Sequence, residues 1–259
     1  MNIVVLVKQV PDSSSERTLH ESDKTVDRDS ASLVINEMDE YAIEEALKVK
    51  EAHGGEVTVL TMGPDKATES IRKALSMGPD KAVHVNDPAL HGSCALVTSK
   101  VLAKALSTLE WDLVIAGAES TDGQVSALPA MLAERLGVAQ LTGARKLTVD
   151  GSALTVERAT DDGYQVVQAA TPAIVSVWDT INEPRYPSFK GIMQAKSKPV
   201  TTLTLADLGI SPDEAGLGAA TSEVVEAAPR PPKQAGVKIP DEGDGGVKLA
   251  EFLAAGKFV

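Results

Sequence analysis

Short apolar runs alternate with helix-like stretches along the first half of the chain. The runs lie at residues 2–7, 56–63, 81–85 and 112–117. Runs this short and this continuously apolar are typical of strands that are covered on both faces. Helix-like stretches follow at residues 39–55, 66–78, 95–106 and 127–137. Because parallel strands need a crossover connection, this alternation predicts an α/β fold with a doubly wound, mostly parallel sheet.

The pattern changes after Gly143. Residues 145–158 (RKLTVDGSALTVER) place an Asp-Gly turn between two alternating apolar runs, which is a strong hairpin signal. Residues 161–179 add two more strand-like runs. We expect these runs to extend or flank the sheet with antiparallel pairs.

The last part of the chain is rich in proline and glycine. Only residues 247–255 (VKLAEFLAA) look helical there. Such a segment buries little apolar surface by itself, so it is either flexible or lies along another chain. We therefore predict a nucleotide-binding α/β domain at residues 1–200 and an extended C-terminal arm at residues 201–259.

The hexapeptide MGPDKA occurs at residues 62–67 and again at 77–82. The first copy places Pro64 where a helix can begin, and the second places Gly78 where a helix can end. The two copies therefore mark opposite ends of one helix and are not an internal repeat.

Composition and charge exclude several classes of function. The chain has 259 residues, a net charge of −12 and 3% aromatic residues, which disfavours binding to nucleic acid. The start, MNIVVLVKQV, lacks the charged first region of a signal peptide, and no apolar run approaches the roughly 18 residues of a membrane span. The single cysteine, Cys94, excludes an internal disulfide and fits a reducing compartment. We expect a cytoplasmic protein without direct membrane insertion.

Residues 117–137 (GAESTDGQVSALPAMLAERLG) are the best candidate for a small-molecule site. They leave the carboxyl end of a predicted parallel strand, where open α/β sheets bind ligands. Ser120, Thr121 and Asp122 are good helix N-caps, and a helix N-terminus can hold phosphate. The alternative interpretation is that these residues only cap a structural helix and bind no ligand. A P-loop is not present, because the pattern GxxxxGK[ST] does not occur.

Other reactive side chains form no catalytic constellation. His91 and Cys94 are neighbours, but a small cysteine at a helix start is usually a packing residue. The other histidines have no metal-ligand spacing, and Asp161 and Asp162 fit a turn beside Gly163. GLGAAT (216–221) imitates part of a dinucleotide motif but follows no strand. A nucleotide-type fold without reactive groups indicates binding without turnover, so we expect no enzyme.

Residues 156–177 (VERATDDGYQVVQAATPAIVSV) and 182–198 (NEPRYPSFKGIMQAKSK) resemble the signature region of the electron transfer flavoprotein β subunit. IVVLVKQVPD, INEMDEYAIEEALKVKE and TMGPDKATESIRKALSMGPDKAVHV also stand where that family has them, so the resemblance covers most of the chain. It implies a Rossmann-like, adenine-nucleotide hydrolase-like fold and a heterodimer with an α subunit, on which the C-terminal arm at residues 201–259 should dock. The α subunit carries most of an FAD site, and the β subunit binds AMP structurally. The heterodimer takes electrons from acyl-CoA dehydrogenases of fatty acid β-oxidation and related dehydrogenases, and passes them to a membrane-bound quinone oxidoreductase.

The resemblance also implies site residues. The AMP site should use residues of the first strand, of INEMD, of the second strand's end and of the loop from 117 to 128: Leu6, Asn36, Glu37, Met38, Asp39, Met62, Gly117, Ser120, Thr121, Asp122, Gly123, Gln124, Val125, Ser126, Ala127 and Leu128. Residues 182–196 resemble the loop that docks on the partner dehydrogenase. Its expected docking residues are Arg185, Tyr186, Phe189, Ile192 and Met193, with Phe189 as the anchor and with Arg185 and Lys190 steering the encounter.

The chain departs from the family pattern in places. Many relatives read closer to IDGDTAQVGP in the phosphate loop, whereas this chain has TDGQVSALPA, with Ala127 in place of a glutamine. Some relatives hold a second FAD at this site, and the changed loop favours AMP. The alternatives are an ATP-using enzyme or a nucleotide sensor of the related adenine-nucleotide-binding fold. Such enzymes usually carry an SGGxDS-type loop after the first strand, where this chain has VKQVPDSSS.

Overall fold

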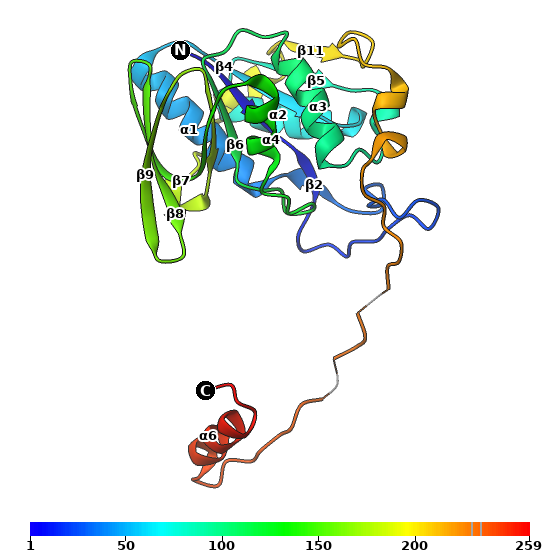
Figure 1. The fold of residues 1–259 in the computed structure, drawn as a ribbon, viewed down its shortest axis with the longest axis vertical. Helices are drawn as coiled ribbons and strands as arrows, with labels where there is room; N and C mark the ends of the chain where they lie inside the picture. Colours follow the sequence, from blue (N-terminus) through cyan, green and yellow to red (C-terminus); the bar gives the residue numbers. More distant parts are fainter. Residues whose placement is uncertain (229, 234) are drawn as a thin grey trace. The chain divides into compact units, whose positions relative to one another are not determined.

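The computed structural model describes residues 1–228, 230–233 and 235–259 of the chain. It contains two compact units, Met1–Glu223 and Val224–Val259. The first unit is an α/β body, and the second contains helix α6 (Gly245–Ala255) (Figure 1).

A nine-stranded sheet runs through the first unit in the order β11-β5-β4-β1-β6-β10-β7-β8-β9. The strands that pair in parallel are β11 (Val200–Leu203), β5 (Lys81–Val85), β4 (Glu56–Met62), β1 (Asn2–Leu6), β6 (Leu113–Gly117), β10 (Ala173–Val177) and β7 (Ala139–Asp150). β8 (Ala153–Thr160) and β9 (Gly163–Ala170) extend the sheet with antiparallel pairs. This confirms the predicted doubly wound, mostly parallel sheet with antiparallel additions. A second, two-stranded sheet pairs β2 (Gln9–Pro11) with β3 (Leu33–Ile35).

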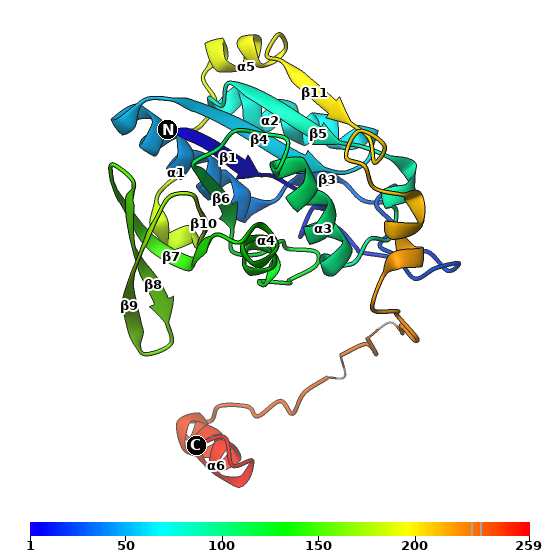
Figure 2. The same ribbon diagram turned by 45° about the horizontal axis from the view of Figure 1, so that its top comes forward.

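Both faces of the parallel sheet are buried, which explains its continuously apolar strands. The helices that cover it are α1 (Glu37–His53), α2 (Thr68–Met77), α3 (Ala95–Leu106) and α4 (Leu128–Leu136) (Figure 2). Ile3 and Val5 of β1 join the core cluster that contains the apolar residues of α1 and α2. Val4 and Leu6 join the opposite cluster, with α3 and α4. Since successive side chains of a strand point to opposite faces, each residue of β1 has a core to enter.

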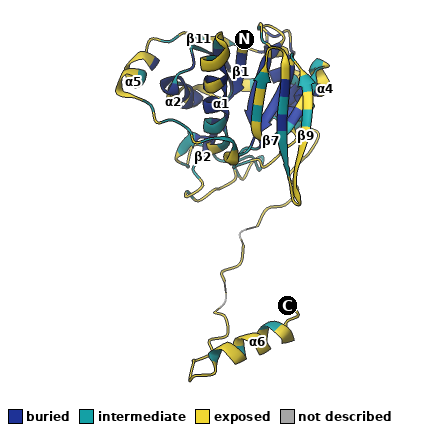
Figure 3. Ribbon diagram, turned by 90° about the vertical axis from the view of Figure 1, so that its left-hand side faces the viewer, coloured by how far each residue is buried: buried dark blue, intermediate teal, exposed yellow. Residues whose placement is uncertain are grey.

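The predicted hairpin between residues 145 and 158 is confirmed. β7 and β8 pair through Val149 and Leu154, and Gly151 in the turn has a φ of 58°, a left-handed conformation that glycine adopts without a Cβ penalty. Leu154 and Val156 are fully buried and face the core. β9 forms the edge of the sheet and is exposed along much of its length (Figure 3).

The predicted boundary between residues 200 and 201 falls inside a strand. β11 pairs with β5, and Leu205, Leu208 and Ile210 after it are buried in the cluster that contains α3. The first compact unit therefore extends to Glu223, because these spaced apolar residues cover the sheet face beside α3.

The segment after Glu223 forms a unit of its own. The helix predicted at residues 247–255 is present as α6, and its Val247, Leu249 and Phe252 are exposed. Among the described residues, no helix is both long enough and apolar enough to cross a membrane.

The two MGPDKA copies delimit one helical segment, as predicted. Pro64 precedes a 3₁₀ turn, η1 (Asp65–Ala67), which leads directly into α2. Gly78 is the C-cap of α2 with a φ of 147°. The physical reason is the asymmetry of helix ends, where proline suits the start and glycine the end.

Candidate functional site

The strand order of the sheet reverses between β1 and β6. From β1 the chain adds β4 and β5 on one side, and β6 and β10 lie on the other. Open parallel sheets bind ligands at the carboxyl ends of their strands beside such a reversal. Residues 36–39 and 117–128, two segments of the predicted nucleotide site, meet there.

Asn36 joins these two segments. Its side-chain amide donates to Asp39 Oδ1 at 2.9 Å and to the carbonyl of Glu119 at 3.0 Å, and its Oδ1 accepts from the backbone N–H of Thr121 at 3.1 Å. Gly117 allows the end of β6 to approach the first turn of α1 closely, because a Cβ at this position would lie 2.6 Å from Met38 Cβ. The start of α1 and the loop after β6 therefore form one packed unit.

Asp39 is buried beneath this junction. Its Oδ2 accepts from the backbone N–H of Lys8 at 2.7 Å, and its Oδ1 accepts from Asn36. Burial raises the pKa of Asp39 from its ordinary value of 3.8 to about 7, against the opposing effect of these hydrogen bonds. The carboxyl group links the end of β1 to the first turn of α1.

The raised pKa of Asp39 predicts a pH dependence of stability. The folded protein binds the carboxyl proton more tightly than the unfolded chain does. The contribution of Asp39 to the free energy of unfolding is therefore greatest below the unfolded pKa of 3.8, and it is lost as the pH rises to about 7. Urea unfolding of wild type and Asp39→Asn at pH 5 and pH 8 tests this. The free energy of unfolding should fall more over this interval in wild type than in the variant. An equal fall in the free energy of unfolding in both proteins would contradict the prediction.

Asp122 binds two cations. Its Oδ1 accepts from Lys8 Nζ at 2.7 Å and its Oδ2 from Arg28 Nη2 at 2.6 Å, while Lys8 Nζ also donates to Ser120 Oγ at 3.3 Å. Burial alone would raise the pKa of Asp122, but the Lys8 ammonium and the Arg28 guanidinium hold it well below its usual range. The carboxylate is ionised and serves as the shared counter-ion of both side chains.

The loop that follows Asp122 is open to solvent. Residues 123–127 are exposed, and Gln124 lies in the left-handed region with a φ of 49°. The N-cap of α4 is Ala127, which supplies no side-chain cap, so Ser120, Thr121 and Asp122 are not the N-caps that we predicted. Asp122 is used by Lys8 and Arg28 instead, and the helix begins later, at Leu128. No side chain therefore caps the backbone N–H groups of Leu128 and Ala130 at the start of α4, while Pro129 between them has no N–H.

The remaining predicted site residues line the same edge of the sheet. Leu6 ends β1 and is buried, Met62 ends β4 and is half-buried, and Glu37 in the first turn of α1 is exposed. Sequence reasoning missed Lys8 and Arg28. Lys8 carried a signal, as the first polar residue after the first strand, whereas Arg28 lies in a long polar loop without a recognisable motif.

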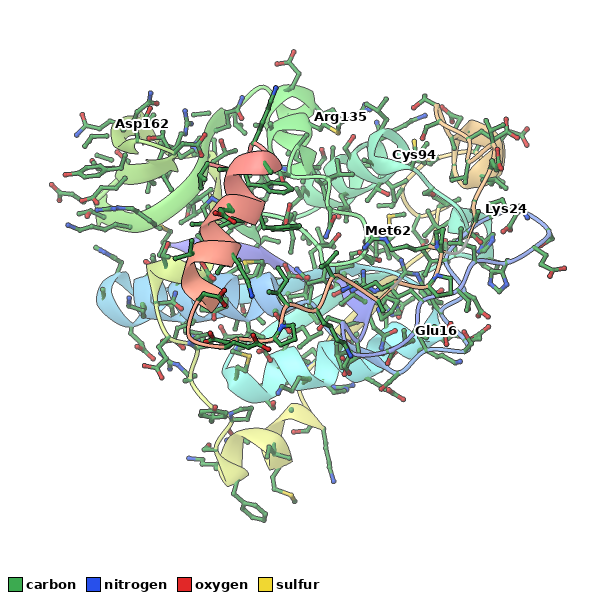
Figure 4. All side chains as sticks on the ribbon, turned by 90° about the horizontal axis from the view of Figure 1, so that it is seen from below. Glu16, Lys24, Met62, Cys94, Arg135 and Asp162 are labelled. Carbon is green, nitrogen blue, oxygen red and sulfur yellow. The ribbon has the colours of Figure 1, made fainter. Side chains whose placement is uncertain are left out.

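The other reactive side chains lie apart from this site. His91 Nε2 is 2.8 Å from Asp23 Oδ2, and Cys94 Sγ is 3.6 Å from Thr221 Oγ1, so His91 and Cys94 use different partners. Asp161 and Asp162 lie in the turn between β8 and β9, as predicted (Asp162 in Figure 4). The described residues contain no cluster of His, Cys, Asp or Glu that could hold a metal ion.

Residues 182–196, the α5 segment, contain a short helix, α5 (Phe189–Ala195). Ser188 caps it by accepting from the backbone N–H of Gly191 at 3.0 Å. A Cβ on Gly191 would clash with the carbonyl oxygen of Ser76, so α5 rests directly on the end of α2. Arg72 of α2 donates to the carbonyls of Ala195 and Lys198 at 2.7 and 2.9 Å. The base of the helix is therefore held firmly.

The opposite side of this segment is exposed and apolar. Tyr186 is 95% exposed and Phe189 82%, and Ile192 and Met193 are exposed beside them. We call these four residues the α5 patch. A rigid base under a group of exposed apolar side chains is the arrangement expected of an interaction surface.

Arg185, which we expected to steer the encounter, forms ion pairs within this protein. Its guanidinium donates to Glu44 Oε2 at 2.7 Å and to Glu51 Oε1 at 2.6 Å. These carboxylates raise the pKa of Arg185 above its ordinary range. Arg185 therefore fastens the α5 segment to α1, and Lys190, which is exposed, stays a predicted steering residue.

Replacing Arg185 by alanine should lower the free energy of unfolding by about 1–2 kcal/mol. The Glu44 side chain is only 8% exposed, so its carboxylate would lose its partner in a poorly solvated place. Urea unfolding measures the loss, and Arg185→Lys, which keeps the charge without the forked geometry, should recover part of it. Unchanged stability of Arg185→Ala would contradict the fastening role.

Known proteins resemble this chain over its whole length. A model of the electron transfer flavoprotein domain matches residues 23–208. "Electron transfer flavoprotein subunit beta" of Mycobacterium leprae (strain TN) is 54% identical over 264 residues, and that of Mycobacterium tuberculosis (strain ATCC 25618 / H37Rv) is 53% identical; each alignment covers 100% of this chain and 99% of the relative. "Caffeyl-CoA reductase-Etf complex subunit CarD" of Acetobacterium woodii is 34% identical over 241 residues, with 92% of each chain covered. With these similarities and the confirmed fold, the chain belongs to the electron transfer flavoprotein family, as a β subunit.

Proposed function

We propose that this β subunit holds AMP at the carboxyl edge of its sheet and docks a partner dehydrogenase through the α5 patch. It works as a heterodimer with an α subunit that carries most of the FAD site. The heterodimer accepts electrons from acyl-CoA and related dehydrogenases and passes them toward the quinone pool. The chain itself supplies binding surfaces and has no catalytic residues of its own.

The observation that carries the nucleotide proposal is the open loop at the sheet reversal. Residues 123–127 are exposed above the uncapped start of α4, and the cations Lys8 and Arg28 lie beside them. Backbone N–H groups at a helix start and nearby cations suit a phosphate group. The residues present therefore fit AMP, whose phosphate would lie at this loop.

Bound AMP would stabilise the folded protein from inside. The loop after β6 is already joined to the start of α1 through Asn36, and a nucleotide that contacts residues 36–39 and 117–128 together would strengthen this junction. A ligand that binds only the folded state stabilises it by an amount that grows with the logarithm of the ligand concentration divided by its Kd. This explains a binding role without turnover.

The α5 patch supports the docking proposal. Tyr186 and Phe189 account for much of the exposed aromatic surface, and exposed aromatic anchors supply much of the binding energy of interfaces. One relative is named as a subunit of a caffeyl-CoA reductase–Etf complex, which supports an oxidoreductase of CoA esters as the partner class. The FAD of the α subunit supplies the electron-carrying chemistry, while this chain selects which enzyme approaches it.

Coexpression with the α subunit tests these proposals. We expect a yellow heterodimer that releases FAD and AMP on denaturation and that hydrolyses no ATP. Hydrolysis of ATP by the purified protein would instead favour the ATP-using enzymes of the related fold, our alternative. A heterodimer that releases FAD without AMP would refute the nucleotide assignment and leave electron transfer intact.

A further inference from the structure

Helix α5 carries most of the α5 patch on a base that is largely polar. The helix has 7 residues, fewer than an isolated helix needs to be stable in water. Of these residues only Ala195 is buried, so apolar packing fixes little of the helix. The position of the patch therefore depends on hydrogen bonds that neighbouring elements supply.

Arg72 of α2 supplies the hydrogen bonds at the end of α5. Its Nη1 donates to the carbonyl of Ala195 at 2.7 Å and to the carbonyl of Lys198 at 2.9 Å. The last four carbonyls of a helix have no partner within it, and Ala195 bears one of them. The guanidinium charge also suits the negative end of the helix dipole. Arg72 therefore caps the C-terminus of α5 from another helix.

Lys198 makes the reverse connection. Its Nζ donates at 2.9 Å to the carbonyl of Leu75, which is one of the last four carbonyls of α2. The ammonium is partly removed from solvent, and this burial lowers the pKa of Lys198. The two helices lie against each other (Figure 2), and each C-terminus is capped by a cation from the other segment.

This exchange of caps fixes the last turn of α5. Ile192 and Met193 of the α5 patch lie in this turn and are exposed, whereas Ala195 in the same turn is buried. Gly191 leaves no room for a side chain between α5 and the carbonyl of Ser76. Fraying or rotation of the turn would change which side chains reach solvent, so the caps select the face of α5 that a partner meets.

We propose that Arg72 is a positioning residue for docking, which acts with Lys198 to hold the α5 patch in the orientation that a partner dehydrogenase binds. This inference rests on the proposed docking function. A patch that is ordered before the encounter avoids the entropy cost of ordering it during binding. Without the cap, the last turn of α5 would fray, and each docking event would have to order it again.

The test measures flavin reduction in the purified heterodimer by an acyl-CoA dehydrogenase that its acyl-CoA substrate has reduced. Arg72→Met keeps the length of the side chain and removes its donors. It should raise the heterodimer concentration needed for half-maximal rate by about three- to tenfold, with the rate at saturation within about twofold of wild type. Arg72→Lys keeps the charge without the forked geometry and should recover part of the loss.

Hydrogen exchange gives a readout that a general loss of stability would not produce. Amides of residues 190–198 should exchange faster in Arg72→Met, while those of β1 and β4 should exchange as in wild type. Lys198→Met removes only the reverse cap and should change exchange and docking in the same direction. It tests the same role even if Arg72→Met does not fold.

Arg135→Met is the matched control for Arg72→Met. The guanidinium of Arg135 on α4 donates to the carbonyl of Leu96 on α3 at 3.1 Å, so this variant also removes an arginine that joins two helices. The helices α3 and α4 cover the opposite face of the sheet from α2. Arg135→Met should therefore dock as wild type does.

A double variant separates positioning from direct contact with the partner. Adding Arg72→Met to Phe189→Ala should weaken docking less than adding it to wild type, because the anchor that Arg72 positions is already missing. A full additional loss in the Phe189→Ala background, wild-type docking by Arg72→Met, or an equal loss in Arg135→Met would overturn the positioning role.

The Phe189→Ala variant distinguishes this inference from the docking proposal itself. If Phe189→Ala impairs docking while Arg72→Met and Lys198→Met do not, only the positioning role fails. If Phe189→Ala docks as wild type does, the docking proposal fails, and the positioning role fails with it.

Discussion

Replacing Phe189 by alanine should slow reduction of the heterodimer's flavin by its partner dehydrogenase by about ten- to hundredfold in kcat/KM. Phe189 is 82% exposed on a helix whose base is fixed to α2, so the change removes an interface anchor and leaves the fold intact. The free energy of unfolding should change by no more than about 0.5 kcal/mol, and the FAD content should stay the same.

The measurement is a stopped-flow rate of flavin reduction at increasing heterodimer concentration. A docking defect should raise the concentration needed for half-maximal rate, with little change in the rate at saturation. Leu96→Ala is the control, because Leu96 is also an exposed apolar residue, 42% exposed, but lies on α3 away from the α5 patch. Loss of FAD together with rate in Phe189→Ala would indicate a structural role and contradict docking.

Replacing Gly117 by alanine should destabilise the protein by about 1–3 kcal/mol and reduce the AMP that copurifies with it. The added Cβ would lie 2.6 Å from Met38 Cβ and 2.7 Å from Asp39 Oδ1. Met38 Cβ is fixed to the backbone and Asp39 Oδ1 is held by Asn36, so the start of α1 must move away from the end of β6. This movement would separate the two segments that Asn36 joins.

Gly218→Ala is the matched control for Gly117→Ala. It adds the same methyl group to a glycine of the same compact unit, outside residues 36–39 and 117–128, and its Cβ would meet open space. Urea unfolding and the quantity of released AMP should therefore separate the two variants clearly. Equal stability and equal AMP content would show that the junction of α1 and β6 tolerates an added methyl group. The proposal that AMP stabilises this junction would then fail.

The sequence predicted the order and type of most elements because their signals are local. Continuous apolar strands, the Asp-Gly turn at residues 150–151 and the Pro64 and Gly78 helix ends each depend on a few neighbouring residues. The boundary at residue 200 failed for the opposite reason. Whether Leu205 and Ile210 are buried depends on an open sheet face beside α3, which no local pattern reveals.

The residues of the candidate site also fall into those that a local sequence pattern predicts and those that it does not. The loop from 117 to 128 could be found because it follows a strand and precedes a helix, and Phe189 stood out in a proline-bounded segment. Arg28 and the fastening of Arg185 could not be found from the sequence. Arg28 contacts Asp122 across 94 positions, and Arg185 contacts Glu44 across 141 positions.

The sequence by itself determined the doubly wound sheet, the position of the loop at residues 117–128 after a strand and the presence of aromatic residues between prolines. Periodicity and turn chemistry are properties of neighbouring residues, so they can be read along the chain. Only the tertiary structure decided that Asp122 is shared by Lys8 and Arg28, that Asp39 is buried and that Arg185 is bound to α1. Partners of charged groups are set by which loops the sheet brings together, and the pKa of a carboxyl group follows from that three-dimensional neighbourhood.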